Sequence, residues 1–261
     1  MKKTLIFSIC IAVVFWSCID NNPVDVYYYR VNIDGFGPNN TLLGTNDGYV
    51  LGDANGKPIS KVYHYISSYG NGVFKVYQYD YTTYKWYNFG LIDSTGKEIT
   101  EMKYDRIEWP FSKDGFVAAF IGYFDSDYGW KGKWGYLNRA GKEAIEIKYD
   151  KICNFTTYGD FQNAYGGAYF HHGLAYVMLD GKYGYIDTTG KVIIPIMYDY
   201  ATVFYEEFAL VSLDNKWGFI DTTGEVVIPI IYEEAWPFDK GRAWVRLNGE
   251  GFYINKKGER I

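Results

Sequence analysis

The sequence predicts an all-β fold made of tandem repeats, and two observations carry this prediction. A segment occurs twice in nearly the same form, as KYGYIDTTGKVIIPIMYDYAT at residues 182–202 and as KWGFIDTTGEVVIPIIYEEAW at residues 216–236. The chain also holds 28 Tyr, 17 Phe and 8 Trp beside 29 Gly and only 7 Pro. Aromatic residues separated by glycine turns favour strands over helices. A repeated β unit buries its apolar face only against a neighbour, so we expect the copies to stack into an array.

Residues 1–17 predict a signal peptide that is not part of the fold. Lys2 and Lys3 form a positive start, and the apolar run LIFSICIAVVFW that follows is too short for a permanent membrane span. Ser17 and Cys18 then resemble the lipobox of bacterial lipoproteins, which implies cleavage before Cys18 and lipidation of that cysteine. The alternative is an ordinary secretory signal. Lipid on Cys18 would anchor the protein to a membrane that the chain does not cross, and we expect an exported, outer-membrane lipoprotein of the cell envelope.

Two segments are predicted to precede the clear repeats. IDNNPVD after Cys18 is polar and suits a tether, so residues 18–46 are predicted to form a tether and an N-terminal cap. DGYVLGDANGKPI, at residues 47–59, is a faded copy of the repeated segment. Residues 47–86 are therefore predicted to be a degenerate repeat.

Glycines mark the spacing of the clear repeats. Every unit has a turn glycine, and these are Gly96, Gly141, Gly190, Gly224 and Gly258. The last three are 34 residues apart, whereas the earlier intervals are longer. A second glycine lies six residues before each turn glycine except the last, where Phe252 takes its place. We predict units that start near residues 87, 132, 181 and 215 and a terminal half-unit at residues 249–261.

Each unit is predicted to be a three-stranded antiparallel meander. In the last full unit the strands are KWGFID, EVVIPI and RAWVRL. The first two are joined by a turn in which Asp221 bonds its own backbone and Gly224 takes a left-handed conformation. Asn248-Gly249 predicts a two-residue turn of the primed type, so the third strand pairs with the first strand of the next unit. Pro229 cannot donate to a strand ladder, which either places the second strand at a sheet edge or ends the strand there.

These residues match a known family of repeats. KWGYLNRAGKE, KYGYIDTTGKV and KWGFIDTTGEV, each followed by an I-x-Y-[DE] step, resemble the WG (or KWG) repeat of bacterial proteins. The resemblance covers residues 87–261, about two-thirds of the chain. It implies a repeat protein that mediates binding, and it says little about activity.

Charge and cysteine content limit the possible functions. The formal net charge is −5, and it becomes −7 without residues 1–17 because that segment holds two lysines and no acids. An acidic chain without a basic run lacks the electrostatic footprint of a nucleic-acid-binding protein. If Cys10 leaves with the signal peptide and Cys18 carries lipid, Cys153 remains alone, and no intrachain disulfide is available.

Residues that recur once per unit are predicted to be structural. The Trp-Gly pairs could be ligand platforms, but we expect Trp217 to pack over a neighbouring backbone that Gly218 admits closely. An acid also follows a tyrosine in each unit, at Asp105, Asp150, Asp199 and Glu233. Catalysis by paired carboxylates needs two acids in different environments, so we expect these acids to accept backbone hydrogen bonds instead.

The remaining motifs predict no catalytic, cofactor or metal site. His171-His172 points to opposite faces if extended, which disfavours joint metal binding. DSDYG at residues 125–129 lacks the later acids of a calcium loop. GFGPNN at residues 35–40 lacks the third glycine of a dinucleotide fingerprint, and no nucleophile elbow is present. We therefore expect a protein that is not an enzyme.

Two insertions predict where a partner binds. They lie near Ile121–Lys131 and Thr156–Phe170, and both start from the end of the repeat opposite the Asp-Thr-Thr-Gly turns. Additions to a repeat often collect on its functional face, although tolerated loops without a role are the alternative. We name the aromatic residues of these insertions the binding rim, and they are Tyr123, Tyr128, Trp130, Tyr158, Phe161 and Tyr165.

The resulting functional prediction is a binding or scaffolding module at the cell envelope whose partner is a protein. The alternative is a glycan-binding envelope lipoprotein that uses exposed aromatic side chains. A hydrolase would need a unique acid or nucleophile, and the sequence offers none that stands out.

Overall fold

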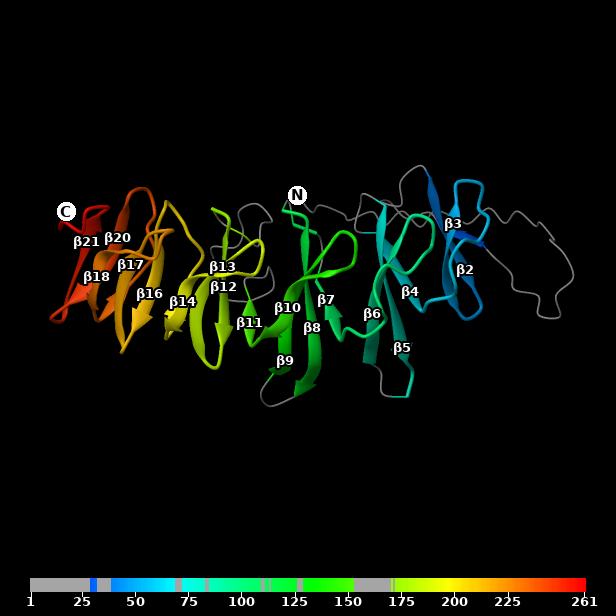
Figure 1. Ribbon diagram of the computed structural model, residues 1–261, viewed down its shortest axis with the longest axis horizontal. Helices are drawn as coiled ribbons and strands as arrows, with labels where there is room; N and C mark the ends of the chain where they lie inside the picture. Colours follow the sequence, from blue (N-terminus) through cyan, green and yellow to red (C-terminus); the bar gives the residue numbers. More distant parts are fainter. Residues whose placement is uncertain are drawn as a thin grey trace, which may run out of the picture. The chain divides into compact units, whose positions relative to one another are not determined.

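The computed structural model describes residues 29–31, 39–68, 72–82, 85–108, 111–112, 114–125, 129–152, 170 and 172–261. The regular structure of these residues is entirely β-strand, which confirms the predicted all-β fold class (Figure 1). The chain divides into two compact units, Met1–Ile107 and Glu108–Ile261. The predicted signal peptide and Cys18 lie outside the described residues.

The first unit contains two three-stranded antiparallel sheets. Their strands are β1 (Tyr29–Val31), β2 (Asn40–Thr45) and β3 (Gly48–Asp53), then β4 (Tyr65–Ser68), β5 (Val73–Asp80) and β6 (Lys85–Asp93). A short strand, β7 (Arg106–Ile107), follows. Apolar side chains of both sheets form one buried cluster, with Leu42 and Leu51 from the first sheet and Phe74, Val76 and Ile92 from the second.

The second unit contains four sheets in chain order, from green to red in Figure 1. The first includes β8 (Phe116–Asp125), β9 (Gly129–Asn138) and β10 (Glu143–Tyr149). The second has β11 (Lys151–Ile152), β12 (Leu174–Leu179), β13 (Lys182–Asp187) and β14 (Val192–Tyr198). The third has β15 (Tyr200–Ala201), β16 (Ala209–Leu213), β17 (Lys216–Ile220) and β18 (Val226–Tyr232), and the terminal sheet has β19 (Glu234–Ala235), β20 (Arg242–Leu247) and β21 (Glu250–Asn255).

The predicted pairing across repeat boundaries is confirmed. β12 ends one sequence unit, and it pairs along its whole length with β13, which begins the next. The turn between them is Asp180-Gly181, with φ of 51° and 77°. Two consecutive positive φ angles define the primed turn that suits the twist of a hairpin. The same geometry recurs at Asp214-Asn215 and Asn248-Gly249.

A short strand completes each sheet, and sequence analysis does not predict it. β15 pairs with β16 through Tyr200↔Ser212 and Ala201↔Val211, and β11 and β19 take the same place in their sheets. The order in the second and third sheets is therefore short strand, third strand, first strand, second strand, and the terminal sheet has the first three of these. Because β14 and β16 belong to different sheets, the strands of one sequence unit are shared between two neighbouring sheets.

The glycine of each Trp-Gly pair admits a bulge in the edge strand. β18 lies at the edge of its sheet, as predicted from Pro229, and its register with β17 shifts between Trp217↔Tyr232 and Phe219↔Ile228. A Cβ on Gly218 would lie 2.7 Å from the Pro229 carbonyl oxygen and from the Ile230 Cα. The bulged backbone therefore crosses directly over the glycine, and no larger residue fits there.

Successive sheets of the second unit pack face to face. Side chains alternate along a strand, so each sheet has one face rich in aromatic residues and one face of small aliphatic residues. In the third sheet these faces hold Leu210 with Phe219, and Val211 with Ile220. Leu210 and Phe219 form a buried cluster with Ala243, Val245 and Ile254, the aliphatic face of the terminal sheet.

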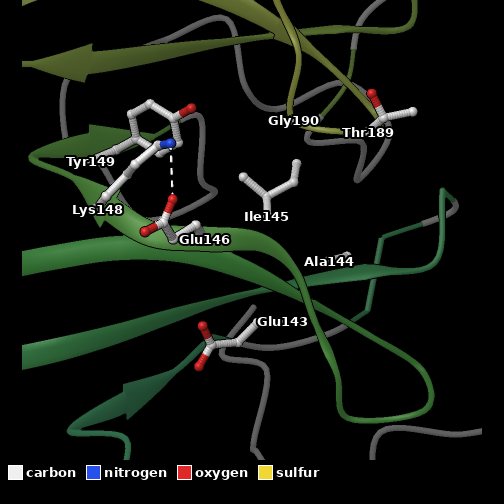
Figure 2. Close-up of a pocket in the computed structure, with 8 residues that line it drawn as sticks. All are labelled: Glu143, Ala144, Ile145, Glu146, Lys148, Tyr149, Thr189 and Gly190. Atoms are coloured by element: carbon white, nitrogen blue, oxygen red, sulfur yellow. Dashed lines mark hydrogen bonds and ion pairs between the residues drawn. The ribbon is translucent and has the colours of Figure 1, made fainter.

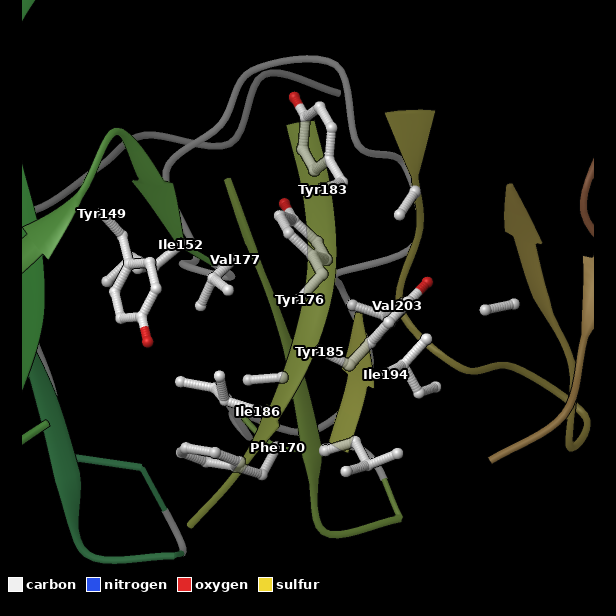
Figure 3. Packing of buried hydrophobic residues seen from close by; sticks show 14 of the residues in the cluster. Tyr149, Ile152, Phe170, Tyr176, Val177, Tyr183, Tyr185, Ile186, Ile194 and Val203 are labelled. Atoms are coloured by element: carbon white, nitrogen blue, oxygen red, sulfur yellow. The ribbon is translucent and has the colours of Figure 1, made fainter. Parts of the chain in front are cut away.

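The second sheet shows the same arrangement. Tyr185 and Ile194 lie on one side of it with Val203, while Val177 and Ile186 lie on the other side with Ile152 (Figure 3). All of these residues belong to one cluster that continues from the first sheet of the unit to the third.

Turn glycines lock neighbouring sheets together. Ideal Cβ atoms on Gly190 and Gly224 would lie 3.4 and 3.3 Å from the side chains of Ile145 and Ile194. Each turn therefore rests on the buried isoleucine of the preceding second strand. Within the turn Asp221 Oδ1 accepts hydrogen bonds from the N–H groups of Thr223 (2.9 Å) and Glu225 (3.0 Å), as the sequence predicts.

Candidate binding surface

Three of the recurring acids, Asp150, Asp199 and Glu233, accept backbone hydrogen bonds, as predicted. Asp150 Oδ1 accepts a hydrogen bond from Lys133 Nζ in β9 (2.5 Å), and its Oδ2 accepts one from the Asp180 N–H (2.7 Å). Lys133 belongs to the same sheet as β10, whereas Asp180 lies in the turn of the next sheet. Partial burial acts to raise the pKa of Asp150, but these two hydrogen bonds hold it below its usual value.

The same link recurs at the next junction. Asp199 accepts hydrogen bonds from Lys182 Nζ and from the Asp214 N–H, the latter at 2.8 Å. The pKa of Asp199 is lowered mainly by the hydrogen bond from the Lys182 ammonium, and to a smaller degree by the one from the Asp214 N–H. At the last junction Glu233 Oε2 accepts a hydrogen bond from the Gly249 N–H (3.1 Å). Both oxygens of the two aspartates are thus engaged in holding sheets together, which argues against a catalytic role.

A histidine takes the acid's place in the first unit. His64 follows Tyr63 as Asp199 follows Tyr198, and its Nδ1 accepts a hydrogen bond from the Tyr79 N–H (3.1 Å). By register Tyr79 is equivalent to Asp214, since Tyr65↔Tyr77 matches Tyr200↔Ser212. The only histidine outside the His171-His172 pair is therefore a structural acceptor.

The Trp-Gly aromatics pack against the stack, in agreement with the sequence prediction, but to different degrees. Trp134 and Tyr183 are each 8% exposed, whereas Trp217 is only half-buried. The Trp217 ring lies 5.4 Å from the ring of Tyr200, centroid to centroid. Trp217 is consequently less buried than the position in the repeat suggests.

One cleft of about 470 Å³ lies at the junction between the first and second sheets of the second unit. Its lining comes from β10 and from the Thr189-Gly190 turn, with Ile145 and Tyr149 at its buried side (Figure 2). Lys148 Nζ donates to Glu146 Oε2 (2.9 Å), and this hydrogen bond raises the lysine pKa. The Gly190–Ile145 contact in this cleft recurs as Gly224–Ile194 at the next junction. The contact between turn glycine and isoleucine in this cleft is therefore a general feature of repeat stacking.

The predicted binding rim is described only in part. The first insertion extends the β8–β9 hairpin to ten residue pairs, against six in β12–β13. Tyr123 lies near its tip opposite Lys131 and is 60% exposed. The backbone of Trp130 lies in β9, opposite Phe124. The other rim residues lie outside the described residues, and they are Tyr128, Tyr158, Phe161 and Tyr165.

The calcium-like segment and the histidine pair do not form a metal site in the part of the chain that the structure describes. Asp125, the first residue of the calcium-like DSDYG segment, lies 3.2 Å from Lys131 Nζ as an ion pair across the hairpin. His172 is exposed in a tight turn with φ of 53°, while His171 and Cys153 lie outside the described residues. Among the residues that the structure describes, no three His, Cys, Asp or Glu side chains converge as metal ligands would.

The terminal sheet carries a surface that sequence analysis does not identify. Trp236, which directly follows β19, forms one row with Trp244 in β20 and Tyr253 in β21, and we name this the terminal aromatic row. The Trp236 N–H donates to the Trp244 carbonyl (2.9 Å), and Trp244 is opposite Tyr253. The two Trp rings lie 5.4 Å apart at 46°, and Trp236 and Tyr253 are 64% and 41% exposed.

The fold and these junctions define a class, the tandem β-repeat protein whose small antiparallel sheets stack in series. A family model for the WG containing repeat matches residues 89–125, 134–163, 183–217 and 217–250. The matches together cover just over half of the chain, so the protein belongs to the WG repeat family. No match was found among curated proteins.

Solved structures resemble the chain only distantly. The crystal structure of a eukaryotic initiation factor aligns at 9% identity and a TM-score of 0.43, over 85% of this chain and 61% of that one. An extracellular domain from B. thetaiotaomicron aligns at 11% identity and a TM-score of 0.26, over 87% of this chain and 37% of that one. This chain thus spans less than two-thirds of both. A protein from Listeria monocytogenes aligns at 11% identity and a TM-score of 0.28, over 90% of this chain and 93% of that one. The described residues include no helix that is long and apolar enough to cross a membrane.

Proposed function

We propose that this chain is a lipid-anchored binding module that holds a protein partner at the cell envelope. The stack of sheets supplies a rigid frame, and loops at its ends vary without disturbing the core. The observation that carries the proposal is the extended β8–β9 hairpin, which projects an exposed Tyr123 beyond the length that the repeat requires. Tyrosine offers a large contact area at low cost in conformational entropy, which suits adaptable recognition. We propose a binding role and no catalytic one.

The test of this role is capture of a partner by the intact and the trimmed protein. The register shows how to trim the hairpin, because Ile121↔Lys133 is equivalent to Leu179↔Lys182. Replacing residues 122–132 with Asp-Gly reproduces the Asp180-Gly181 turn, and the segment Thr156–Phe170 is shortened in the same protein. We expect a partner from an envelope extract to bind the full chain and not the trimmed chain. Full binding by a trimmed protein with unchanged circular dichroism would contradict the proposal.

The location at the envelope rests on the Ser17-Cys18 junction behind the apolar run. We predict that Cys18→Ser moves the protein from the membrane fraction to the soluble fraction, because two or three acyl chains supply the anchor. Immunoblots of fractions washed with high salt measure this. A variant that still sediments with membranes would exclude the lipoprotein interpretation and leave the ordinary secretory signal.

Glycan binding is the second candidate function, and the terminal aromatic row favours it. Three neighbouring aromatic side chains, with two of them well exposed, make an apolar surface on the terminal sheet. This surface lies on the terminal sheet and is separate from the binding rim.

A further inference from the structure

The terminal aromatic row occupies a face that the other sheets of this unit bury. In the third sheet the equivalent positions hold Thr202, Leu210 and Phe219, since the Thr202 N–H donates to the Leu210 carbonyl (3.1 Å) and Leu210 is opposite Phe219. Leu210 and Phe219 are 4% and 1% exposed because the terminal sheet covers them. On the same face of the terminal sheet Trp236 and Tyr253 are 64% and 41% exposed.

A glycine in the terminal sheet fixes the position of the Trp244 ring. Gly251 stands where the preceding unit has Trp217, since Arg246↔Gly251 matches Ser212↔Trp217. An ideal Cβ on Gly251 would lie 2.6 Å from the Trp244 indole. The indole therefore lies against the backbone of β21, in space that a side chain on Gly251 would fill. One ring face rests on the sheet, and the ring is held in place without a covering layer.

Charged groups flank the aromatic row. Arg246 and Glu234 are opposite each other on neighbouring strands and form an ion pair. The equivalent pair in the third sheet is Ser212 and Tyr200. On the other side of the row the Arg242 guanidinium lies 4.8 Å from the centre of the Tyr253 ring. Hydrogen-bond donors thus lie on both sides of the rings, and Glu234 adds an acceptor on one side.

This combination disfavours another sheet as the occupant. A sheet stacked here, as on the third sheet, would bury Arg246, because the equivalent Ser212 is 4% exposed. It would also partly cover Glu234 and Arg242, because the equivalent Tyr200 and Phe208 are half-buried. Removing a charged pair from water costs several kcal/mol per ion unless the new contacts restore every hydrogen bond. The interface between the third and terminal sheets avoids this cost because Ser212 and Tyr200 carry no charge. The substitutions at the terminal sheet therefore favour a ligand that keeps polar groups solvated at its rim.

We propose that the terminal aromatic row is a carbohydrate-binding site. A sugar ring has an apolar face of C–H groups and a rim of hydroxyl groups. The apolar face packs on Trp236 and Trp244 while the hydroxyls reach Glu234 and Arg246, which accept and donate hydrogen bonds. Tyr253, with Arg242 above it, provides a second contact for a neighbouring sugar of the same chain. The ligand class is accordingly an oligosaccharide of two or more sugars.

Tryptophan fluorescence provides a direct assay of the full chain. We titrate the protein with cellohexaose, chitohexaose and maltohexaose, and then screen it on a glycan array. We expect saturable quenching by at least one glycan, and a loss of affinity of about tenfold or more in Trp236→Ala and in Tyr253→Ala, which corresponds to about 1.4 kcal/mol. The control is Tyr81→Ala, which removes a side chain that is 68% exposed in the first unit. Its affinity should be unchanged.

Three results would overturn the proposal. One is the absence of any glycan ligand on the array. Another is binding that both Trp236→Ala and Tyr253→Ala leave unchanged while circular dichroism shows intact sheets. The third is concentration-dependent self-association that Trp236→Ala abolishes, since the face would then be an interface between copies. The protein-binding role is tested separately, because Trp236→Ala retains the β8–β9 hairpin and should still capture the protein partner.

Discussion

At the scale of single residues, the repeat depends on backbone space more than on side-chain chemistry. Gly135, Gly184 and Gly218 each lie under the bulged backbone of the neighbouring edge strand, with ideal Cβ contacts between 2.5 and 2.8 Å. The contacts are to backbone atoms, which cannot rotate away as a side chain could. The glycine of the Trp-Gly pair is therefore required by packing, whatever the aromatic residue before it.

We predict that Gly218→Val destabilises the protein by about 3 kcal/mol, the upper part of the range for overpacking. The added side chain would push β18 away from β17 and disturb the contact of Ile228 with the terminal sheet. The midpoint of urea unfolding, followed by circular dichroism, measures the effect. Lys216→Val on the same strand is the control, because the Lys216 side chain is exposed. Equal midpoints for the two variants would contradict the packing role.

A second residue-scale feature is a strained turn before β16. Glu206 and Glu207 have φ of 49° and 81°, whereas the second turn residue before the equivalent strands β12 and β20 is Gly173 or Gly241. A non-glycine residue in the left-handed region costs about 1–2 kcal/mol. Lys256 Nζ lies 3.7 Å from Glu207 Oε2, but an ion pair this exposed contributes little.

We predict that Glu207→Gly stabilises the protein by about 1 kcal/mol, because glycine adopts this conformation without a Cβ clash. A rise in the thermal midpoint measures it. Glu207→Ala is the matched control, since it also removes the carboxylate but keeps the Cβ. If alanine stabilises as much as glycine does, the effect comes from charge and not from backbone strain.

At the scale of elements, the sequence specifies the long strands and their turns but not the boundaries of the sheets. Turn residues such as Asp221 and Gly224 have local conformational preferences, so their roles can be predicted from sequence alone. The two-residue strands cannot, since Tyr200-Ala201 is too short to show any periodicity. The connection from β14 to β15 also changes sheets within two residues, and no local signal marks that change.

The acid links between sheets make stability depend on pH. The pKa of Asp199 is lowered in the folded protein, chiefly by Lys182 and then by the Asp214 N–H. A lowered folded pKa means that the stabilisation is complete above the unfolded value of about 3.9 and is lost as pH falls through the folded value. The link between the second and third sheets should therefore weaken only in acid.

We predict that Asp199→Asn lowers the thermal midpoint at pH 7, because asparagine loses the charge that pairs with Lys182. The difference between wild type and variant should shrink as pH falls below about 4 and through the lowered pKa of Asp199 in the folded protein. Thermal melts at a series of pH values measure this. Glu225→Gln, at an exposed carboxylate in the neighbouring turn, is the control and should follow the wild type. A difference that stays constant down to pH 2 would exclude the ion pair as its cause.

At the scale of the whole molecule, position in the stack decides what a side chain does. Phe219 and Tyr253 occupy the same place in their repeats, yet they are 1% and 41% exposed. Phe252, in place of the second glycine, marks the final unit as atypical, but no sequence pattern distinguishes Trp236 and Trp244 from buried aromatic residues. The exposure of the terminal aromatic row depends on packing between sheets, which no local pattern encodes.

Stacked sheets that contact only their neighbours should also unfold in an order set by position. Ile220 lies between the second and third sheets, and Ile254 lies between the third and terminal sheets; both are fully buried. Truncation of a buried isoleucine to alanine costs about 2–5 kcal/mol. Each truncation therefore weakens a different interface, the one between the second and third sheets for Ile220 and the one between the third and terminal sheets for Ile254.

We predict that Ile254→Ala accelerates amide hydrogen exchange in β20 and β21 and leaves β12 and β13 protected. The terminal sheet has a single neighbour in the described chain, so weakening that interface allows it to open alone. Ile220→Ala should accelerate exchange in β16, β17, β20 and β21 together, because these strands lie beyond the weakened interface. Hydrogen exchange with mass spectrometry resolves these peptides. If either variant raises exchange equally from β8 to β21, the second unit unfolds as one cooperative block, and the nearest-neighbour description of the stack is wrong.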